Sequence, residues 1–165
     1  MKKFTIYIFL ILSLLLQGCS FSDPKYINFS EKSSPDFYTK EIYSKLLNDE
    51  EYSLELFNTN FYKTVPINKE EDNDIIENFI RSLSKDNYKT DGVIPEEKEP
   101  YQLKIIFDDS KYVIKIYSNS TVTVSPWDGI YPEDIINIED VPNRYNLFDF
   151  CSHIEHEWKY NQWYL

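Results

Sequence analysis

Three segments between residues 101 and 125 constrain the fold of this chain more than any other feature of its sequence. Residues 101–107, 111–117 and 121–125 are rich in β-branched and aromatic side chains that alternate with polar ones, as is typical of β-strands. Only three residues separate each segment from the next. Because connections this short join antiparallel neighbours, the sequence predicts a three-stranded meander.

The apolar face of this meander needs a cover, and residues 75–83 can provide it. Their apolar side chains recur at helical spacing and form a single stripe, which predicts an amphipathic helix. Asn68 is expected as its N-cap, with Glu71 as the capping-box partner. A last helix is expected to begin near Asn143 and to pack on the sheet through a second apolar stripe, which consists of Leu147, Cys151, Ile154 and Trp158.

Two further elements are expected earlier in the chain. From Tyr52, alternation predicts a strand that continues to about Val65, with a bulge or bend at Asn58 and Asn60. A helix that begins near residue 35 would precede this strand, with an apolar side made of Tyr38, Ile42, Leu46 and Leu47.

These elements predict an α+β fold. The mainly antiparallel sheet would comprise the three-stranded meander and the earlier strand, and one or two amphipathic helices would cover it. Residues 35–165 are enough for one domain with a hydrophobic core, but hardly for two.

The N-terminus has the pattern of an export signal. Lys2 and Lys3 precede an apolar run over residues 4–16, which gives the charged start and hydrophobic middle of a signal peptide. The run is shorter than the roughly 20 residues that a helix needs to cross a bilayer. We therefore expect residues 1–18 to be a removable signal peptide.

The run ends in Leu16-Gln17-Gly18-Cys19, which resembles the lipobox of bacterial lipoproteins. The resemblance implies a covalent diacylglyceryl lipid on the Cys19 thiol and cleavage between Gly18 and Cys19. Gln17 departs from the small residue that is most common at its position. Residues 19–34 are polar and would form a flexible tether, so the expected location is the outer, extracytoplasmic face of the cell membrane.

Composition limits the source and the partners. The chain has no alanine and is rich in Lys, Asn and Ile, a codon bias that favours a low-GC Gram-positive source. Loss of residues 1–18 leaves 15 basic residues against 28 acidic residues, a formal charge of −13. Such a surface disfavours nucleic acid and electrostatic adhesion to anionic lipid, so the covalent lipid would supply the anchoring.

The candidate chemistry near the C-terminus is sparse. On a helical wheel Asp149, His153 and His156 share one side, opposite Cys151, so a surface metal site is geometrically possible. A solvated polar face is the simpler interpretation. Neither a nucleophile motif nor a cofactor fingerprint is present in the sequence, and we expect no enzymatic activity and no cofactor beyond the lipid.

Aromatic residues make up 17% of the chain and suggest a binding role instead. Trp127, Asp128 and Tyr131 occupy an expected turn after the meander, and turns set on a rigid sheet often carry recognition. Exposed rings there would form a patch for a protein or a sugar. The alternative is that these rings fill the core.

The region after the signal resembles a family of uncharacterised small lipoproteins of low-GC Gram-positive bacteria, known as a domain of unknown function. The motifs that carry the resemblance are Asn58-Thr59-Asn60-Phe61-Tyr62-Lys63, Phe79-Ile80-Arg81-Ser82-Leu83, Pro126-Trp127-Asp128-Gly129 with Glu133-Asp134, and Tyr145-Asn146-Leu147 with Cys151. The family implies the architecture and the location, and no activity.

The sequence therefore favours a membrane-anchored, non-enzymatic binding or interaction module that recognises a protein or a small ligand. Two alternatives remain. One is a metal-dependent enzyme or metal sensor that uses Asp149, His153 and His156. The other is a scaffold subunit of an envelope complex.

Overall fold

The structure is a computed structural model that describes residues 26–27, 32–67, 74–90 and 92–162. The expected signal peptide, Cys19, and the expected capping pair Asn68 and Glu71 lie outside these residues. The described helices are α2 (Phe37–Leu47), α4 (Ile75–Ser82) and α5 (Leu147–Gln162), with single 3-10 turns η2 (Lys85–Asn87) and η3 (Asn143–Tyr145). The described strands are β1 (Tyr26–Ile27), β2 (Tyr52–Asn58), β3 (Lys63–Ile67), β4 (Tyr101–Phe107), β5 (Lys111–Ile116), β6 (Thr121–Pro126), β7 (Gly129–Ile130) and β8 (Asp134–Asn137).

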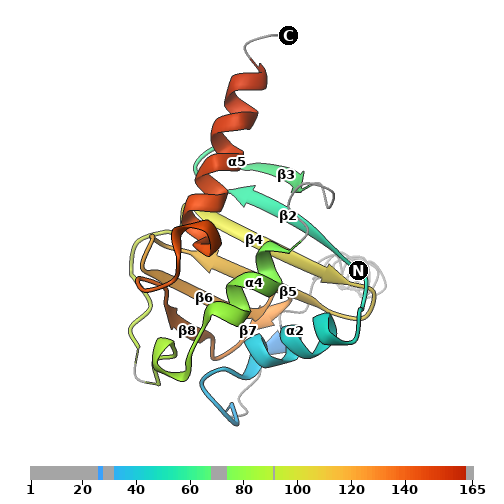
Figure 1. Ribbon diagram of the computed structural model, residues 1–165, viewed down its shortest axis with the longest axis vertical. Helices are drawn as coiled ribbons and strands as arrows, with labels where there is room; N and C mark the ends of the chain where they lie inside the picture. The colour runs from blue at the N-terminus through green and yellow to red at the C-terminus, as the bar shows by residue number, and fades with distance from the viewer. Residues whose placement is uncertain (1–25, 28–31, 68–73, 91, 163–165) are drawn as a thin grey trace, which may run out of the picture.

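The main sheet has six antiparallel strands in the order β3-β2-β4-β5-β6-β8. The predicted meander is confirmed as β4, β5 and β6, at the centre of the sheet and its β8 side (Figure 1). β1 and β7 form a separate parallel pair. The predicted α+β fold class is therefore confirmed, with a larger sheet than the sequence indicated.

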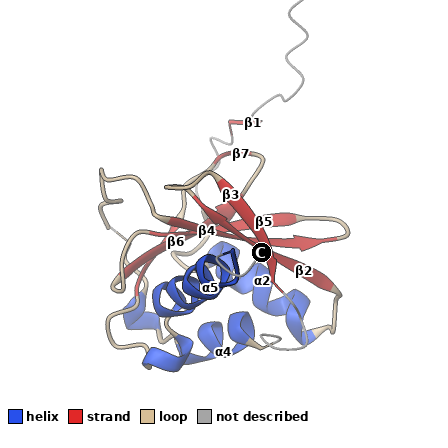
Figure 2. Cartoon of the chain, turned by 90° about the horizontal axis from the view of Figure 1, so that it is seen from above, coloured by secondary structure: helices blue, strands red, loops and turns tan. Residues whose placement is uncertain are grey.

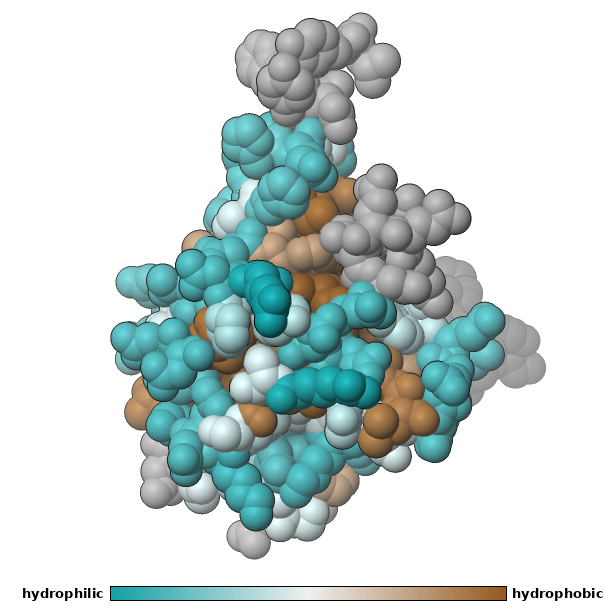
Figure 3. Space-filling view, in the orientation of Figure 1, coloured by the Kyte–Doolittle hydropathy of each residue, from teal (hydrophilic) through white to brown (hydrophobic). Residues whose placement is uncertain are grey.

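All three helices lie on one side of the main sheet, whereas β1 and β7 lie on the other side (Figure 2). Ile76 and Phe79 of α4 are completely buried, as the predicted stripe requires. They belong to one core with the sheet residues Leu103, Ile105, Ile114 and Ile116. The outer surface of this helical face is mainly hydrophilic (Figure 3), so the core is closed on this side.

The prediction of one long first strand was wrong. Instead of one bulged strand there is a hairpin of β2 and β3. The side-chain Oδ1 of Asn58 accepts hydrogen bonds from the backbone N–H of Asn60 (3.0 Å) and of Phe61 (3.1 Å), and so closes the turn. Asn and Asp side chains often mimic a backbone turn in this way. Pro66 lies in β3, an edge strand, where a missing N–H is tolerated.

Two apolar residues that the sequence assigned to buried helix faces lie elsewhere. Leu47 is 56% exposed, at the last position of α2. Trp158 is not part of the hydrophobic core, because the C-terminal part of α5 extends past the edge of the sheet (Figure 1). Tyr38, Ile42, Leu147 and Cys151 are buried as predicted.

β8 was not predicted, because it places a carboxylate on the buried face of the sheet. Asp134 is completely buried. Its Oδ2 accepts hydrogen bonds from the backbone N–H (2.7 Å) and the hydroxyl (2.9 Å) of Thr39, and its Oδ1 lies 3.0 Å from Nζ of Lys32. Burial raises the pKa of the Asp134 carboxyl, although these bonds oppose the rise. Asp134 thus joins α2 to the edge of the sheet.

The strand register gives the sheet two distinct ends. At one end Asn58, the last residue of β2, is opposite Tyr101, which is opposite Ile116. At the other end Tyr112 is opposite Pro126, and β7 follows directly. The β2–β3 turn and β7 therefore lie at opposite ends of strands that are roughly 20 Å long.

Candidate binding surfaces

Aromatic and lysine side chains gather where the β2–β3 turn meets α5. We name this cluster the hairpin surface; it consists of Phe61, Tyr62, Lys63, Lys98, Trp158 and Lys159. The Phe61 and Trp158 rings lie 6.1 Å apart, which is the separation of a favourable aromatic pair. Phe61 is 51% exposed and Tyr62 is 77% exposed. The Phe61 and Tyr62 rings are therefore presented to solvent, and Trp158 beside them is partly buried.

A lysine lies over each ring of the hairpin surface. The distance from Nζ to the ring centroid is 3.8 Å for Lys63 and Trp158, 4.4 Å for Lys159 and Phe61, and 4.5 Å for Lys98 and Tyr62. All three distances fall within the range of cation–π attraction. In the described part of the chain neither Lys63 nor Lys98 forms an ion pair with a carboxylate. The charges of these two lysines are therefore not neutralised by a carboxylate partner among the described residues.

Buried polar groups hold this surface in place. Oε2 of Glu155 on α5 accepts hydrogen bonds from Asn58 (2.8 Å) and from the hydroxyl of Tyr101 (2.6 Å), and Oε1 pairs with Lys159. Burial opposes ionisation of Glu155, but the bonds from Lys159, Tyr101 and Asn58 outweigh it and lower the pKa of this carboxyl. Burial and the bond to Glu155 raise the pKa of Tyr101 to about 12. An ionised Glu155 therefore connects α5 to the β2–β3 turn.

The turn also carries backbone strain. Tyr62 has a φ of 51°, in the left-handed region that large side chains rarely adopt. Lys98 donates a hydrogen bond to the backbone oxygen of Thr59 (3.1 Å) and another to the Tyr62 hydroxyl (3.3 Å). A bulky, exposed ring is therefore held at a position that favours glycine or asparagine, and such strain concentrates at functional sites.

The turn predicted as a binding site is also accessible. Trp127 is 50% exposed, Ile130 is 59% exposed, and Asp128 is exposed. Tyr131 is partly buried, and its hydroxyl donates a hydrogen bond to Oδ1 of Asp128 (3.1 Å). Nζ of Lys111 lies 5.2 Å from the Trp127 ring centroid. The structure thus places Trp127, Asp128 and Tyr131 together on the surface, and the interpretation of all these rings as core filling does not hold for Trp127.

The candidate metal ligands do not converge. Asp149, His153 and His156 are all exposed on α5, and Nε2 of His153 lies 3.3 Å from Oε1 of Glu157. Among the described residues there is no group of three or more His, Cys, Asp or Glu side chains that could hold a metal ion. Cys151 is completely buried, and burial raises the pKa of its thiol well above the usual range. It is therefore a poor nucleophile.

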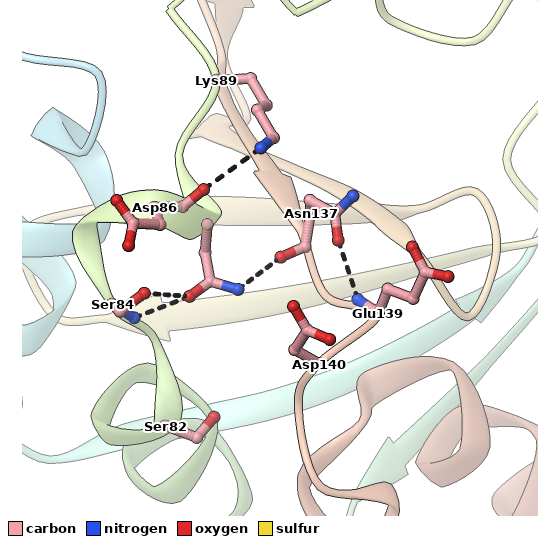
Figure 4. A pocket seen from close by; sticks show the side chains of 8 residues that line it. Ser82, Ser84, Asp86, Lys89, Asn137, Glu139 and Asp140 are labelled. Carbon is pink, nitrogen blue, oxygen red and sulfur yellow. Dashed lines mark hydrogen bonds between the residues drawn. The ribbon is translucent and has the colours of Figure 1, made fainter.

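A polar cleft of about 340 Å³ separates η2 from the end of β8 (Figure 4). Its side-chain amides bond to Ser84 and to the backbone: Asn87 accepts from the N–H and the hydroxyl of Ser84 and donates to the backbone oxygen of Asn137 (2.8 Å), and the side chain of Asn137 accepts from the N–H of Glu139 (3.0 Å). These bonds join η2 to β8. We interpret the cleft as structural.

A larger cavity, of about 1040 Å³, lies between the segment before α2 and the loop after η2. Lys32 at its wall donates to the backbone oxygen of Glu133 (2.6 Å) and pairs with Asp134. Glu133 itself pairs with Lys115 through Oε1 (2.5 Å). Lys32 and Glu133 are therefore ion-paired, whereas Lys89, also at the wall, donates a hydrogen bond to the backbone oxygen of Asp86 (3.2 Å).

These features define a small α+β domain with exposed aromatic surfaces. Residues 32–151 match the family described as "Domain of unknown function (DUF4883)", so the chain belongs to this family. A crystal structure described as a "Putative Lipoprotein from Clostridium perfringens" is similar over 76% of this chain and 99% of that chain, with a TM-score of 0.68 and 28% sequence identity. No protein with a curated description matches this chain. In the described residues no helix is long and apolar enough to span a membrane.

The sequence did not predict the hairpin surface as a site. Its residues come from three segments that are distant in the chain, and Trp158 was assigned to the core. One signal was available: the run from Asn58 to Lys63 has three polar residues followed by two aromatic ones and a lysine. Interpreted as a turn, this run would have predicted exposed rings.

Proposed function

We propose that this protein is an extracytoplasmic lipoprotein, anchored to the membrane through Cys19, that binds an anionic polysaccharide with its hairpin surface. The protein would be a binding module without catalytic activity. The ligand would belong to the cell envelope, because a membrane anchor keeps the domain there.

The anchor is supported by sequence and by similarity. Leu16-Gln17-Gly18-Cys19 follows an apolar run that begins after two lysines, and the similar crystal structure is described as a putative lipoprotein. A lipid on Cys19 would also explain how an acidic chain stays at an anionic surface, where its charge alone would repel it.

The arrangement of rings and cations on the hairpin surface carries the proposed ligand chemistry. The flat apolar faces of Phe61, Tyr62 and Trp158 suit the C–H faces of sugar rings. The ammonium groups of Lys63 and Lys98 suit phosphate or carboxylate groups on the same polymer. In an acidic chain, Lys63 and Lys98 are two cations without a carboxylate ion pair among the described residues, and they favour an anionic ligand at these rings.

Rigidity supports the same proposal. The bonds among Glu155, Asn58 and Tyr101 fix the turn against α5 before any ligand arrives. Binding then costs less ordering entropy, which is the general advantage of a preorganised site.

Co-sedimentation of the detergent-solubilised lipoprotein with purified cell walls tests this proposal. Two preparations are compared: peptidoglycan that carries its covalently attached anionic polymers, and the same material after acid treatment has removed them. We expect binding to the first preparation and at least about tenfold weaker binding to the second. This difference corresponds to about 1.4 kcal/mol of binding free energy.

Matched variants locate the site. Trp158→Ala and the pair Lys63→Gln with Lys98→Gln should each reduce the bound fraction strongly. Trp127→Ala removes an equally large exposed ring at the other end of the sheet and should leave binding unchanged. Equal binding by all variants, or equal binding to both wall preparations, would refute the proposed ligand.

A further inference from the structure

We propose that the turn at β7 contacts the membrane surface, with Trp127 and Ile130 in the lipid interface. This inference rests on the proposed anchoring through Cys19 and extends it: the lipid would be a first contact and the β7 turn a second one. Two contacts would fix the orientation of the domain, which a single contact through the lipid would not do.

The position of β7 relative to the N-terminal segment is the main observation. β1 pairs with β7 in parallel, with Tyr26 opposite Gly129 and Ile27 opposite Ile130. Seven residues lead from Cys19 to Tyr26, and an extended chain of this length spans at most about 25 Å. Because paired strands lie about 5 Å apart, β7 cannot be farther than about 30 Å from the anchored end.

The chemistry of the turn suits a membrane interface. Trp127 and Ile130 are large, apolar and at least half exposed, although neither belongs to the hairpin surface. Tryptophan is enriched at the level of lipid headgroups, where its ring is buried and its N–H stays hydrated. Lys111, whose Nζ lies 5.2 Å from the Trp127 ring centroid, would meet phosphate groups at the same depth.

The charge of the turn permits this contact. Asp128 and Lys111 carry opposite charges at this turn, and Asp109 of the neighbouring β4–β5 turn pairs with Lys45, whereas the chain without residues 1–18 has a formal charge of −13. An anionic bilayer would repel most of the protein surface, but it would not repel this turn.

The two ends of the sheet then have different roles. β7 lies at the end that faces the bilayer, and the β2–β3 turn lies at the opposite end. The hairpin surface would consequently point away from the membrane, toward the envelope polymers that we propose as its ligand.

Quenching of tryptophan fluorescence by brominated lipid tests the inference. Full-length lipidated protein is reconstituted in vesicles of phosphatidylcholine and phosphatidylglycerol with brominated acyl chains. The pair Trp158→Phe and Trp163→Phe leaves Trp127 as the single tryptophan, and the pair Trp127→Phe and Trp163→Phe leaves Trp158. We expect loss of Trp127 emission in the brominated vesicles and unchanged Trp158 emission.

Labelling gives a second readout that leaves every tryptophan in place. The variants Ile130→Cys and Tyr62→Cys are each labelled at the new thiol with a fluorophore that responds to polarity. The other two cysteines should not react, because Cys151 is completely buried and Cys19 would carry the lipid. We expect a blue shift on reconstitution for the label at position 130 and none for the label at position 62.

Vesicle flotation, measured on the same samples, separates this inference from the anchoring proposal. Protein that floats with vesicles but whose Trp127 is not quenched would overturn the β7 contact and leave the anchor intact. Quenching of Trp158 instead of Trp127 would also overturn the β7 contact. A blue shift at position 130 without quenching of Trp127 would overturn it too, and would mean that a second copy of the chain covers the turn. Protein that does not float would refute the anchor, and with it the membrane contact.

Discussion

Nζ of Lys63 on β3 lies 3.8 Å from the ring centroid of Trp158 on α5. This contact joins the edge of the sheet to the part of α5 that extends beyond it, where the hydrophobic core gives no support. The ring and the ammonium group therefore stabilise the surface that we propose as the binding site.

A double-mutant cycle measures this contact. Lys63→Gln, Trp158→Leu and the double variant are unfolded in urea, and the coupling is taken from the three changes in free energy of unfolding. We expect a coupling of about 0.5–1 kcal/mol, as for a partly exposed cation–π pair. A coupling of zero would mean that Lys63 does not interact with the ring in solution.

Two substitutions of Tyr62 should have an unusual order of stability. Tyr62→Gly and Tyr62→Ala both remove the exposed ring, but only glycine adopts a φ of 51° without strain. We therefore expect the Gly variant to be more stable than the Ala variant by about 1 kcal/mol, in chemical denaturation. If the Ala variant is equally stable, the backbone at this position is not strained. Both variants should lose wall binding.

The contribution of Glu155 to the free energy of unfolding should depend on pH, and the direction of this dependence follows from the pKa of its carboxyl. Its pKa is lowered in the folded protein, so the ionised carboxylate stabilises the fold above its ordinary pKa, and this contribution disappears as the pH falls through the folded value. Glu155→Gln should lower the free energy of unfolding by about 1 kcal/mol at neutral pH.

The difference between wild type and Glu155→Gln should then shrink in acid. Denaturation curves of both proteins at several pH values check this expectation. A difference that stays constant with pH would contradict the proposed role of the ionised carboxylate.

Removal of the Asp134 carboxylate should cause a large loss of stability. Asp134→Ala would leave the N–H and the hydroxyl of Thr39 without their buried acceptor, and Lys32 without its partner. We expect a loss of about 3 kcal/mol in the free energy of unfolding. Asp134→Asn keeps one acceptor oxygen and should cost clearly less, so equal losses for the two variants would mean that only the charge matters.

Local periodicity in the sequence was sufficient to predict most of the fold. The alternation in residues 101–125 predicted β4, β5 and β6, and the stripe in residues 75–83 predicted α4 and the sheet face that it covers. The class of fold follows from these elements, because such a sheet must be buried against such a helix.

The missed elements break the local rules for physical reasons. β8 is only four residues long and has a buried carboxylate, whose acceptor role depends on Thr39, far away in the sequence. The β2–β3 turn has neither glycine nor proline and instead places Tyr62 at a positive φ. The hairpin surface requires contact between this turn and Trp158, which no local pattern can reveal.

The most direct test of the proposed function is whether an anionic polysaccharide contacts Trp158. Full-length protein with Trp127→Phe and Trp163→Phe leaves Trp158 as the single fluorophore, and it is titrated in detergent with purified anionic polymer released from cell walls. The proposal predicts a saturable change in Trp158 emission that is lost when Lys63→Gln and Lys98→Gln are added. Unchanged emission at all polymer concentrations, from a protein that circular dichroism finds folded, would contradict it.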